Sequence, residues 1–251
     1  MMGYGLVVRD LYVLFVLLIA SYWDYRKREI EPAYWVYTSI LGALLSLSMY
    51  KSGFIKLNIE AYIIFSLFAI GLVGLFYMLG YMGGADLYAI IFITVSVPMS
   101  LNSSEIIPPT FMTVVYAAIA STFIPIYFCF FNLVSPERRR IIRKQDKGLI
   151  LCFLGIPKKV KEYVTEDGYW FPLTTYVNGE LVTRYSFQVE EEPDDHRKRI
   201  SDLLSRKIIN EGSIIWVTPG IPFVVFILIG YLLSIIISDI PLQVLFGGFG
   251  V

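Results

Sequence analysis

Long apolar runs are the feature that most constrains what this chain can fold into. Runs of about twenty such residues match α-helices that cross the ~30 Å hydrocarbon core of a bilayer at ~1.5 Å per residue. The 251 residues are 56% hydrophobic, and their mean hydropathy of +0.64 is too high for an ordinary soluble domain. We expect an α-helical polytopic membrane protein with six transmembrane helices, drawn from Leu11–Trp23 (a span beginning near Gly5), Tyr34–Tyr50, Glu60–Tyr81, Asp86–Met99, Phe111–Leu133 and Ile221–Ser238.

The charged residues concentrate in one segment between the fifth and sixth runs. Residues 135–219 hold fifteen of the 21 Lys and Arg residues and thirteen of the 21 Asp and Glu residues, so this segment cannot cross a bilayer. We expect a small α+β soluble domain there, with spans one to five in residues 1–134 and the sixth span and tail in residues 220–251.

Local patterns predict the elements of this soluble domain. A continuous apolar run predicts a buried strand, Asn-Gly is typical of a hairpin turn, and apolar residues at helical spacing predict an amphipathic helix. The expected elements are a strand at Leu149–Leu154, a hairpin of Tyr169–Val177 and Glu180–Val189 joined by Asn178-Gly179, a helix with Ile200, Leu203, Leu204 and Ile208 on one face, and a last strand at Ile214–Thr218.

Basic residues predict the orientation of the spans, because Lys and Arg accumulate in cytoplasmic loops. Arg26–Arg28 follow the first run, and the Arg138–Arg140 cluster follows the fifth. With both on the cytoplasmic side, six spans leave both termini outside and the soluble domain in the cytoplasm. Asp24, at the end of the first run, and Asp86, at the start of the fourth, then face the same side.

Asp24 and Asp86 are the candidate catalytic residues. A carboxylate within a span costs roughly 2.5–3.5 kcal/mol on insertion scales, and Asp86 ends the sequence Gly80-Tyr-Met-Gly-Gly-Ala-Asp86 between two apolar runs. Two neighbouring aspartates that share one proton can hydrolyse a peptide bond, one as a base toward water and the other as an acid toward the carbonyl. Gly83 and Gly84 would leave room for an extended substrate backbone beside them.

Each of these features has a simpler explanation. Gly80 and Gly84 match a small-xxx-small helix-packing pattern. A carboxylate at a span end, such as Asp24 before Arg26–Arg28, is commonly an interfacial ion-pair residue, and we assign that role to Asp10 and Asp239. The glycines together with two aspartates on one side favour the catalytic interpretation.

Composition excludes several other chemistries. The formal net charge is +0, so we expect no nucleic-acid partner. The chain has a single histidine. An HExxH site needs two, and we expect no Ser-His-Asp site either. The two cysteines, Cys129 and Cys152, form no CxxC pair, and we therefore expect neither a zinc site nor a disulfide framework.

The motifs resemble those of a known family. Gly83-Gly84-Ala85-Asp86 resembles the GxHyD motif of membrane aspartic peptidases, with Ala85 in the hydrophobic place. Asp24 with the following Tyr-Arg-Lys-Arg-Glu-Ile-Glu-Pro32 resembles the first-aspartate region of prepilin peptidases. The layout of six spans with a soluble insert before the last is most similar to archaeal preflagellin peptidases.

The resemblance implies a function for particular residues. Asp24 and Asp86 would be the catalytic pair, and Gly83, Gly84 and Ala85 would contact the substrate. That substrate would be a preflagellin or type IV pilin-like precursor, whose short basic leader is removed at the cytoplasmic face of the cell membrane. No metal or cofactor is implied.

Departures from related families narrow the prediction. Bacterial prepilin peptidases often carry paired CxxC motifs and also N-methylate their product. This sequence has no CxxC, so we do not expect methyltransferase activity. A presenilin-like intramembrane protease is an alternative, but the Pro-Ala-Leu motif of that group is absent. Two further alternatives are a small ion- or proton-coupled transporter that uses Asp86, and an assembly scaffold that docks partners on residues 135–219.

Overall fold

The computed structural model describes residues 2–52, 58–99, 107–145, 147–177 and 180–247. The chain forms two compact units, which we call the helical unit (Met1–Ser121 and Pro222–Val251) and the inserted unit (Thr122–Ile221). The expected mostly helical architecture with a small α+β region is confirmed.

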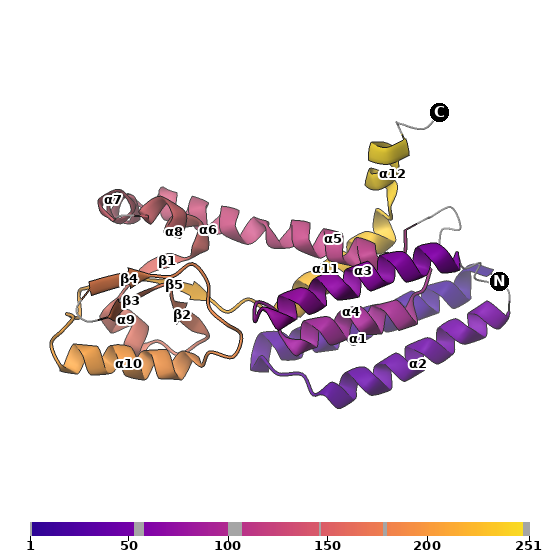
Figure 1. Ribbon diagram of the computed structural model, residues 1–251, viewed down its shortest axis with the longest axis horizontal. Coiled ribbons are helices and arrows are strands. Elements are labelled where there is room, and N and C mark those ends of the chain that lie inside the picture. Colours follow the sequence, from indigo (N-terminus) through magenta and orange to yellow (C-terminus); the bar gives the residue numbers. More distant parts are fainter. Residues whose placement is uncertain (1, 53–57, 100–106, 146, 178–179, 248–251) are drawn as a thin grey trace. The chain divides into compact units, whose positions relative to one another are not determined.

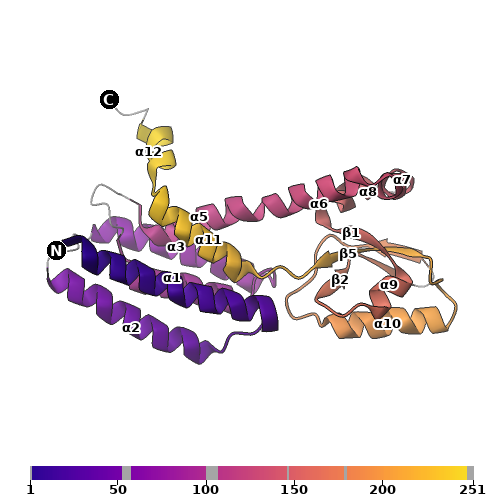
Figure 2. The same ribbon diagram turned by 180° about the vertical axis from the view of Figure 1, so that it is seen from behind.

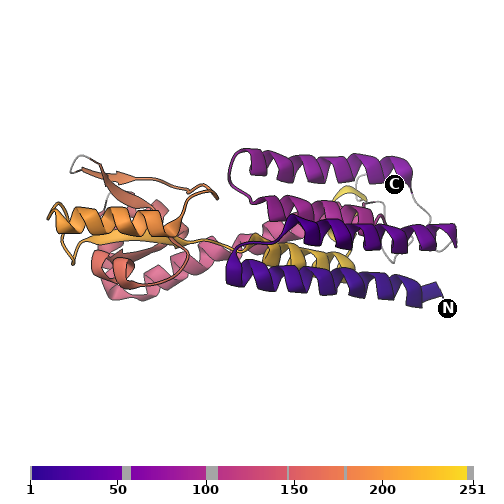
Figure 3. The ribbon, with the colours of Figure 1, turned by 90° about the horizontal axis from the view of Figure 1, so that it is seen from below.

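The helical unit is built around α4 (Figure 1). This helix packs against α1, α2, α3, α5 and α11, and its Phe92 and Ile93 are fully buried in the apolar core. Helices α1 to α4 run alongside one another (Figure 3), and α11 lies beside α1 and α5 (Figure 2). The helices of this unit are α1 (Met2–Lys27), α2 (Pro32–Lys51), α3 (Ile59–Met78), α4 (Gly84–Ser96), α5 (Pro109–Ser121), α11 (Phe223–Ile236) and α12 (Ile240–Gly247).

Six complete spans are not confirmed. Among the described residues, three helical stretches are long and apolar enough to cross a bilayer, namely Gly5–Lys27, Ile59–Met78 and Pro109–Val134. The 13 residues of α4 and the 14 residues of α11 are apolar, but at ~1.5 Å per residue they are shorter than a ~30 Å core. The expected fifth run is divided at Thr122 between α5 and α6 (Phe123–Val134). Several long apolar helices are nevertheless typical of a multi-pass membrane protein.

Gly80 and Gly84 belong to different elements, and the helix-packing explanation for them is therefore wrong. Gly80 has φ of +76°, a conformation that glycine adopts without steric cost. The Tyr81 N–H donates to the Phe76 carbonyl at 3.0 Å and the Gly80 N–H donates to the Tyr77 carbonyl at 3.0 Å, which is the Schellman pattern that ends a helix. Because α4 begins only at Gly84, the two glycines share no helix face.

A buried ion pair on α1 is hydrogen-bonded to α11. The Arg9 Nη2 donates to Asp10 Oδ1 at 2.8 Å, and the Tyr231 hydroxyl donates to the same oxygen at 3.3 Å. Arg9 is 0% exposed, Asp10 6% and Asp239 1%. Asp10 is thus in an ion pair, as predicted, and both Asp10 and Asp239 are buried inside the helical unit.

Gly230 allows α11 to pack closely on α5. A Cβ at this position would lie 2.4 Å from the Thr113 carbonyl oxygen and 2.8 Å from the Ala117 nitrogen. Gly230→Ala should therefore push the two helices apart and destabilise the protein by about 1–3 kcal/mol, which is the usual cost of overpacking. A lower thermal unfolding midpoint in detergent would show this.

Gly71→Ala is the matched control for Gly230→Ala, because nothing lies within 4 Å of a Cβ at Gly71. This variant should unfold at or above the wild-type midpoint, since alanine favours a helix more than glycine does. Equal midpoints for Gly230→Ala and wild type would contradict the close packing of α5 and α11.

The inserted unit combines two small sheets with short helices (Figure 1). An antiparallel sheet of order β1–β5–β2 packs Ile215 and Val217 against Val160, Tyr163 and Ile200 of α9 and α10. A separate antiparallel pair joins β3 to β4. The elements here are α6, α7 (Pro136–Lys144), α8 (Gly148–Leu154), β1 (Ile156–Lys159), α9 (Val160–Thr165), β2 (Trp170–Pro172), β3 (Thr174–Val177), β4 (Glu180–Thr183), α10 (Pro193–Ser205) and β5 (Ile214–Pro219).

Several expectations for this unit are wrong in detail. Leu149–Leu154 is helix α8, with Leu151 and Cys152 buried and Leu149 exposed, because a short apolar run does not distinguish a strand from a buried helix. The first arm of the hairpin breaks at Leu173, whose N–H donates to the Trp216 carbonyl while its own carbonyl accepts from Arg184. Only β3 and β4 form the hairpin, and Asn178-Gly179 lie outside the described residues.

The predicted amphipathic helix and last strand are largely confirmed. Ile200 is buried on α10, and Leu203 and Leu204 pack against the same cluster. The helix ends at Ser205, so Ile208 lies beyond it and is 47% exposed. The last strand is present as β5.

Candidate active site

Asp86 lies at the start of α4, where the local sequence fixes its carboxylate. It is the third residue of the helix, and its Oδ2 accepts the N–H of the N-cap residue Gly83 at 2.9 Å. The Asp86 N–H in turn donates to the Gly83 carbonyl at 3.1 Å. An acidic side chain at this position also suits the positive end of the helix dipole. Asp86 is only 6% exposed.

Asp24 lies in the last turns of α1 and is held by a helix distant in sequence. Its Oδ2 accepts the backbone N–H of Val224 at 3.2 Å, in the first turn of α11. The N-cap residue of α11 is Pro222, whose side chain makes no capping hydrogen bond. Asp24 therefore supplies from α1 the acceptor that a capping side chain usually provides.

A second hydrogen bond fixes the same junction. The Ser21 hydroxyl, one turn before Asp24 on α1, donates to the Val224 carbonyl at 3.3 Å. Both backbone groups of Val224 are thus bound to α1, and the position of the Asp24 carboxylate depends on the docking of α11.

The structure brings the two predicted carboxylates into one site. The end of α1 and the start of α4 lie at the same end of the helical unit (Figure 1), and the charges of Asp24 and Asp86 interact. Each aspartate uses Oδ2 to accept a backbone N–H from a helix start.

Arg28 adds a positive charge next to the pair. It follows the end of α1 with φ of 58°, its N–H donates to the Asp24 carbonyl at 3.2 Å, and its side-chain charge acts on the Asp24 carboxylate. Sequence reasoning considered Arg28, within Arg26–Arg28, as an orientation signal and as an ion-pair partner of Asp24, and it missed Ser21 and Val224 entirely. The sixth apolar run, Ile221–Ser238, predicted the helix that contains Val224, but nothing local connects it to Asp24.

The predicted substrate-contacting residues take different positions beside Asp86. Gly83 is the N-cap of α4 and Gly84 is its first residue, and both are half-buried. The Ala85 side chain packs against the apolar core. Among the described residues, no group of three or more His, Cys, Asp or Glu side chains is placed to hold a metal ion.

Comparison with known families covers most of the chain. The sequence model of the type IV leader peptidase family matches residues 11–126, which include both aspartates. The model described as the archaeal peptidase A24 C-terminus, type II, matches residues 147–240. The chain belongs to the A24 family of aspartic peptidases.

Two curated relatives agree with this A24 assignment along nearly their whole length. A preflagellin peptidase of Methanocaldococcus jannaschii is 29% identical over 250 residues, covering 93% of this chain and 95% of the relative. A preflagellin peptidase of Methanococcus maripaludis is 27% identical over 246 residues, covering 89% of this chain and 92% of the relative. In this A24 peptidase, the matched helical region is the part that assembles the two carboxylates.

Proposed function

We propose that this A24 peptidase removes the short basic leader of preflagellin or type IV pilin-like precursors, with Asp24 and Asp86 as its catalytic pair. The observation that carries the proposal is that the charges of the two carboxylates interact while Oδ2 of each accepts a backbone N–H at a helix start. The names of the two relatives support the substrate class.

The geometry suits hydrolysis with activated water. Two close carboxylates share one proton, because both cannot ionise easily side by side. The unprotonated one takes a proton from water as the water oxygen attacks the scissile carbonyl carbon, and the protonated one donates to the carbonyl oxygen. Collapse of the tetrahedral intermediate breaks the C–N bond, and the proton taken from water passes to the leaving nitrogen. The backbone donors Gly83 and Val224 keep both carboxylates in place throughout.

The cellular arrangement is part of the same proposal. The helical unit would sit in the cell membrane with the aspartates and the inserted unit on the cytoplasmic side. The basic runs Arg26–Arg28 and Arg138–Arg140 support this orientation through the preference of Lys and Arg for cytoplasmic loops. A basic leader at the same face would then meet the aspartate pair where the apolar segment of the precursor enters the bilayer.

Cleavage of a synthetic precursor tests the proposed function. The full chain in detergent is mixed with a peptide that has a short basic leader followed by an apolar segment, and mass spectrometry of both products locates the cut. We expect one cut at the junction, and none with the double variant Asp24→Asn, Asp86→Asn. An intact precursor with folded wild-type protein would overturn the proposal, and ion flux in vesicles would then favour a transporter.

Gly84→Ala tests whether a peptide passes close to the start of α4. A Cβ at Gly84 would meet only Tyr77 Cε2 at 3.7 Å and Tyr88 Cε2 at 4.0 Å, which are ordinary van der Waals contacts, so the fold should be unchanged. If substrate backbone lies over Gly84, the added methyl group should displace it and lower kcat/KM roughly 10- to 100-fold.

Gly74→Ala is the control for Gly84→Ala, because its Cβ would also make only an ordinary contact, with Leu87 Cδ1 at 3.9 Å. This variant should cleave at the wild-type rate. Cleavage by Gly84→Ala at the wild-type rate would show that no substrate backbone approaches this residue.

A further inference from the structure

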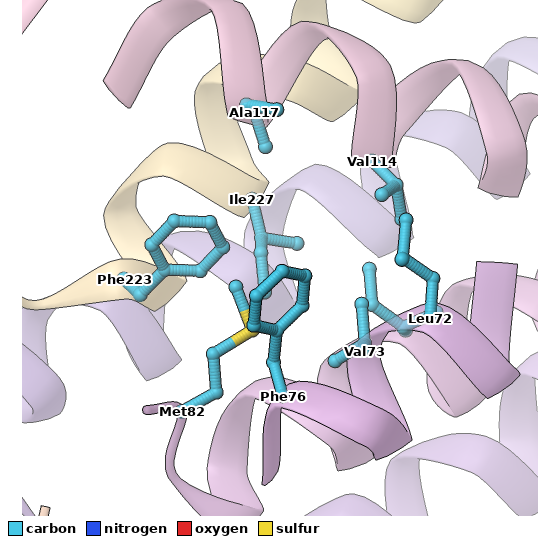
Figure 4. Close-up of a pocket in the computed structure, with 10 residues that line it drawn as sticks. Leu72, Val73, Phe76, Met82, Val114, Ala117, Phe223 and Ile227 are labelled. Carbon is cyan, nitrogen blue, oxygen red and sulfur yellow. The ribbon is translucent and has the colours of Figure 1, made fainter. Parts of the chain in front are cut away.

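An apolar cavity of about 80 Å³ lies inside the helical unit (Figure 4). Its walls come from α3, α4, α5 and α11 and from Met82 in the link before α4, and all the side chains that line it are apolar. Phe76 and Ala118 are among these and are themselves exposed, so a group from outside the chain can reach the cavity. A space of this kind takes hydrocarbon and excludes charged or strongly polar groups.

The cavity adjoins the structures that hold both aspartates. Met82 immediately precedes Gly83, whose N–H binds Asp86. Phe223 immediately precedes Val224, whose N–H binds Asp24. Ile90 lies four residues after Asp86 and therefore on the same face of α4. The cavity is thus lined by the residues that directly precede both backbone donors, and by a residue on the same face of α4 as Asp86.

The cavity also extends away from the aspartates along the helices. Ile90 is one turn beyond Asp86 along α4, and Ile227 is one turn beyond Phe223 along α11. Both helices start at the aspartates and run from there into the apolar core. A chain that passes from the carboxylates toward this cavity must carry an apolar side chain there, whereas a basic leader would be rejected.

We propose that this cavity binds the aliphatic side chain of the residue that directly follows the scissile bond. The inference rests on the proposed function and deepens it by naming a specificity site. The volume is about half that of a cavity of roughly 150 Å³ that holds benzene, so a valine or leucine side chain fits better than an aromatic ring. The cavity therefore favours precursors in which the first residue of the mature chain is aliphatic.

A series of precursors that differ only at this residue tests the inference. With wild type, kcat/KM should be higher for leucine than for alanine by 10-fold or more, since each added methylene in an apolar pocket is worth about 10- to 200-fold. Ala118→Leu places a side chain at the exposed edge of the cavity and should reduce this leucine-to-alanine ratio at least tenfold. Phe76→Ala enlarges the cavity and should raise kcat/KM for a phenylalanine precursor relative to leucine.

A control variant shows whether a change in preference comes from the cavity or from any added leucine side chain on the protein surface. Gly71→Leu adds the same side chain on α3 where nothing lies within 4 Å of the Cβ, and it should keep the wild-type leucine-to-alanine ratio. Because Ala118→Leu and Phe76→Ala change the volume in opposite directions, a folding defect in one does not remove the test.

Three results would overturn the inference. If wild type cleaves the precursors but both cavity variants keep its preferences among them, the cavity does not bind the substrate side chain. In that case only the proposed function stands. Co-purification of a lipid with wild type but not with Ala118→Leu, together with unchanged preferences, would assign the cavity to an acyl chain. If wild type cleaves no precursor at all, the proposed function and this inference both fail.

Discussion

Asp86→Asn should abolish precursor cleavage, with a loss of about 10³-fold or more. Asparagine keeps the shape of the side chain, and its amide oxygen can still accept the Gly83 N–H that Asp86 Oδ2 accepts at 2.9 Å, so α4 should begin at the same residue. What is lost is the proton-transfer group, and removal of a positioned acid or base commonly costs 10²- to 10⁴-fold. The initial rate of product formation at saturating precursor measures the effect.

The matched control for this loss is Asp167→Asn. Asp167 is exposed in the inserted unit, and the same substitution there should leave the rate and the thermal midpoint at their wild-type values. If Asp86→Asn is folded and cuts within about tenfold of wild type, Asp86 is not part of the catalytic pair. A double variant with Asp24→Asn should lose little more than either single variant, because the two carboxylates act as one unit.

Asp24→Asn should cause a loss of the same size, but Asp24 has a second role that a different variant exposes. Its Oδ2 accepts the Val224 N–H at the start of α11, and an asparagine oxygen can keep this bond. Asp24→Ala removes the acceptor and leaves the Val224 N–H without its cap, which costs about 0.5–2 kcal/mol. We therefore expect both variants to be inactive, and only Asp24→Ala to unfold at a lower temperature in detergent.

A longer carboxylic side chain at position 24 tests whether the position of the acid matters as well as its presence. Asp24→Glu retains the acid but moves it by one methylene, and the geometry of the pair should then be lost, with activity far below wild type. Wild-type activity in Asp24→Asn would contradict the two-aspartate mechanism. Equal thermal midpoints for Asp24→Ala and Asp24→Asn would contradict the capping of α11 by Asp24.

Features encoded by neighbouring residues could be predicted from the sequence. The apolar run before Arg26–Arg28 predicts α1, and the glycines before Asp86 predict a break followed by a helix start, because caps and glycine turns act within a few residues. The strand β5 and the buried Ile200 on α10 follow from short-range patterns in the same way. The GxHyD resemblance also depends on adjacent residues alone, and it led to the family that the comparisons support.

Predictions failed where a contact from elsewhere in the chain decided the outcome. Leu149–Leu154 is apolar enough for a strand, but it forms α8, which packs on α6 and α7 and buries Leu151 and Cys152. Leu173 interrupts an expected strand because its N–H and carbonyl bond to different partners, Trp216 and Arg184. Neither partner is near enough in sequence to enter a local pattern.

The sequence by itself determined the helical character of the chain and the charged insert, and it named the two candidate aspartates, since apolar runs and motifs act locally. Only the tertiary structure decided that Asp24 caps a helix 200 residues later, that Arg9 and Asp10 are buried as a pair, and that Met82 and Phe223, next to the two backbone donors, line one apolar cavity. The physical reason is that burial, charge pairing and cavity shape depend on which helices pack together. That packing sums many small contacts between distant residues, which no short stretch of sequence contains.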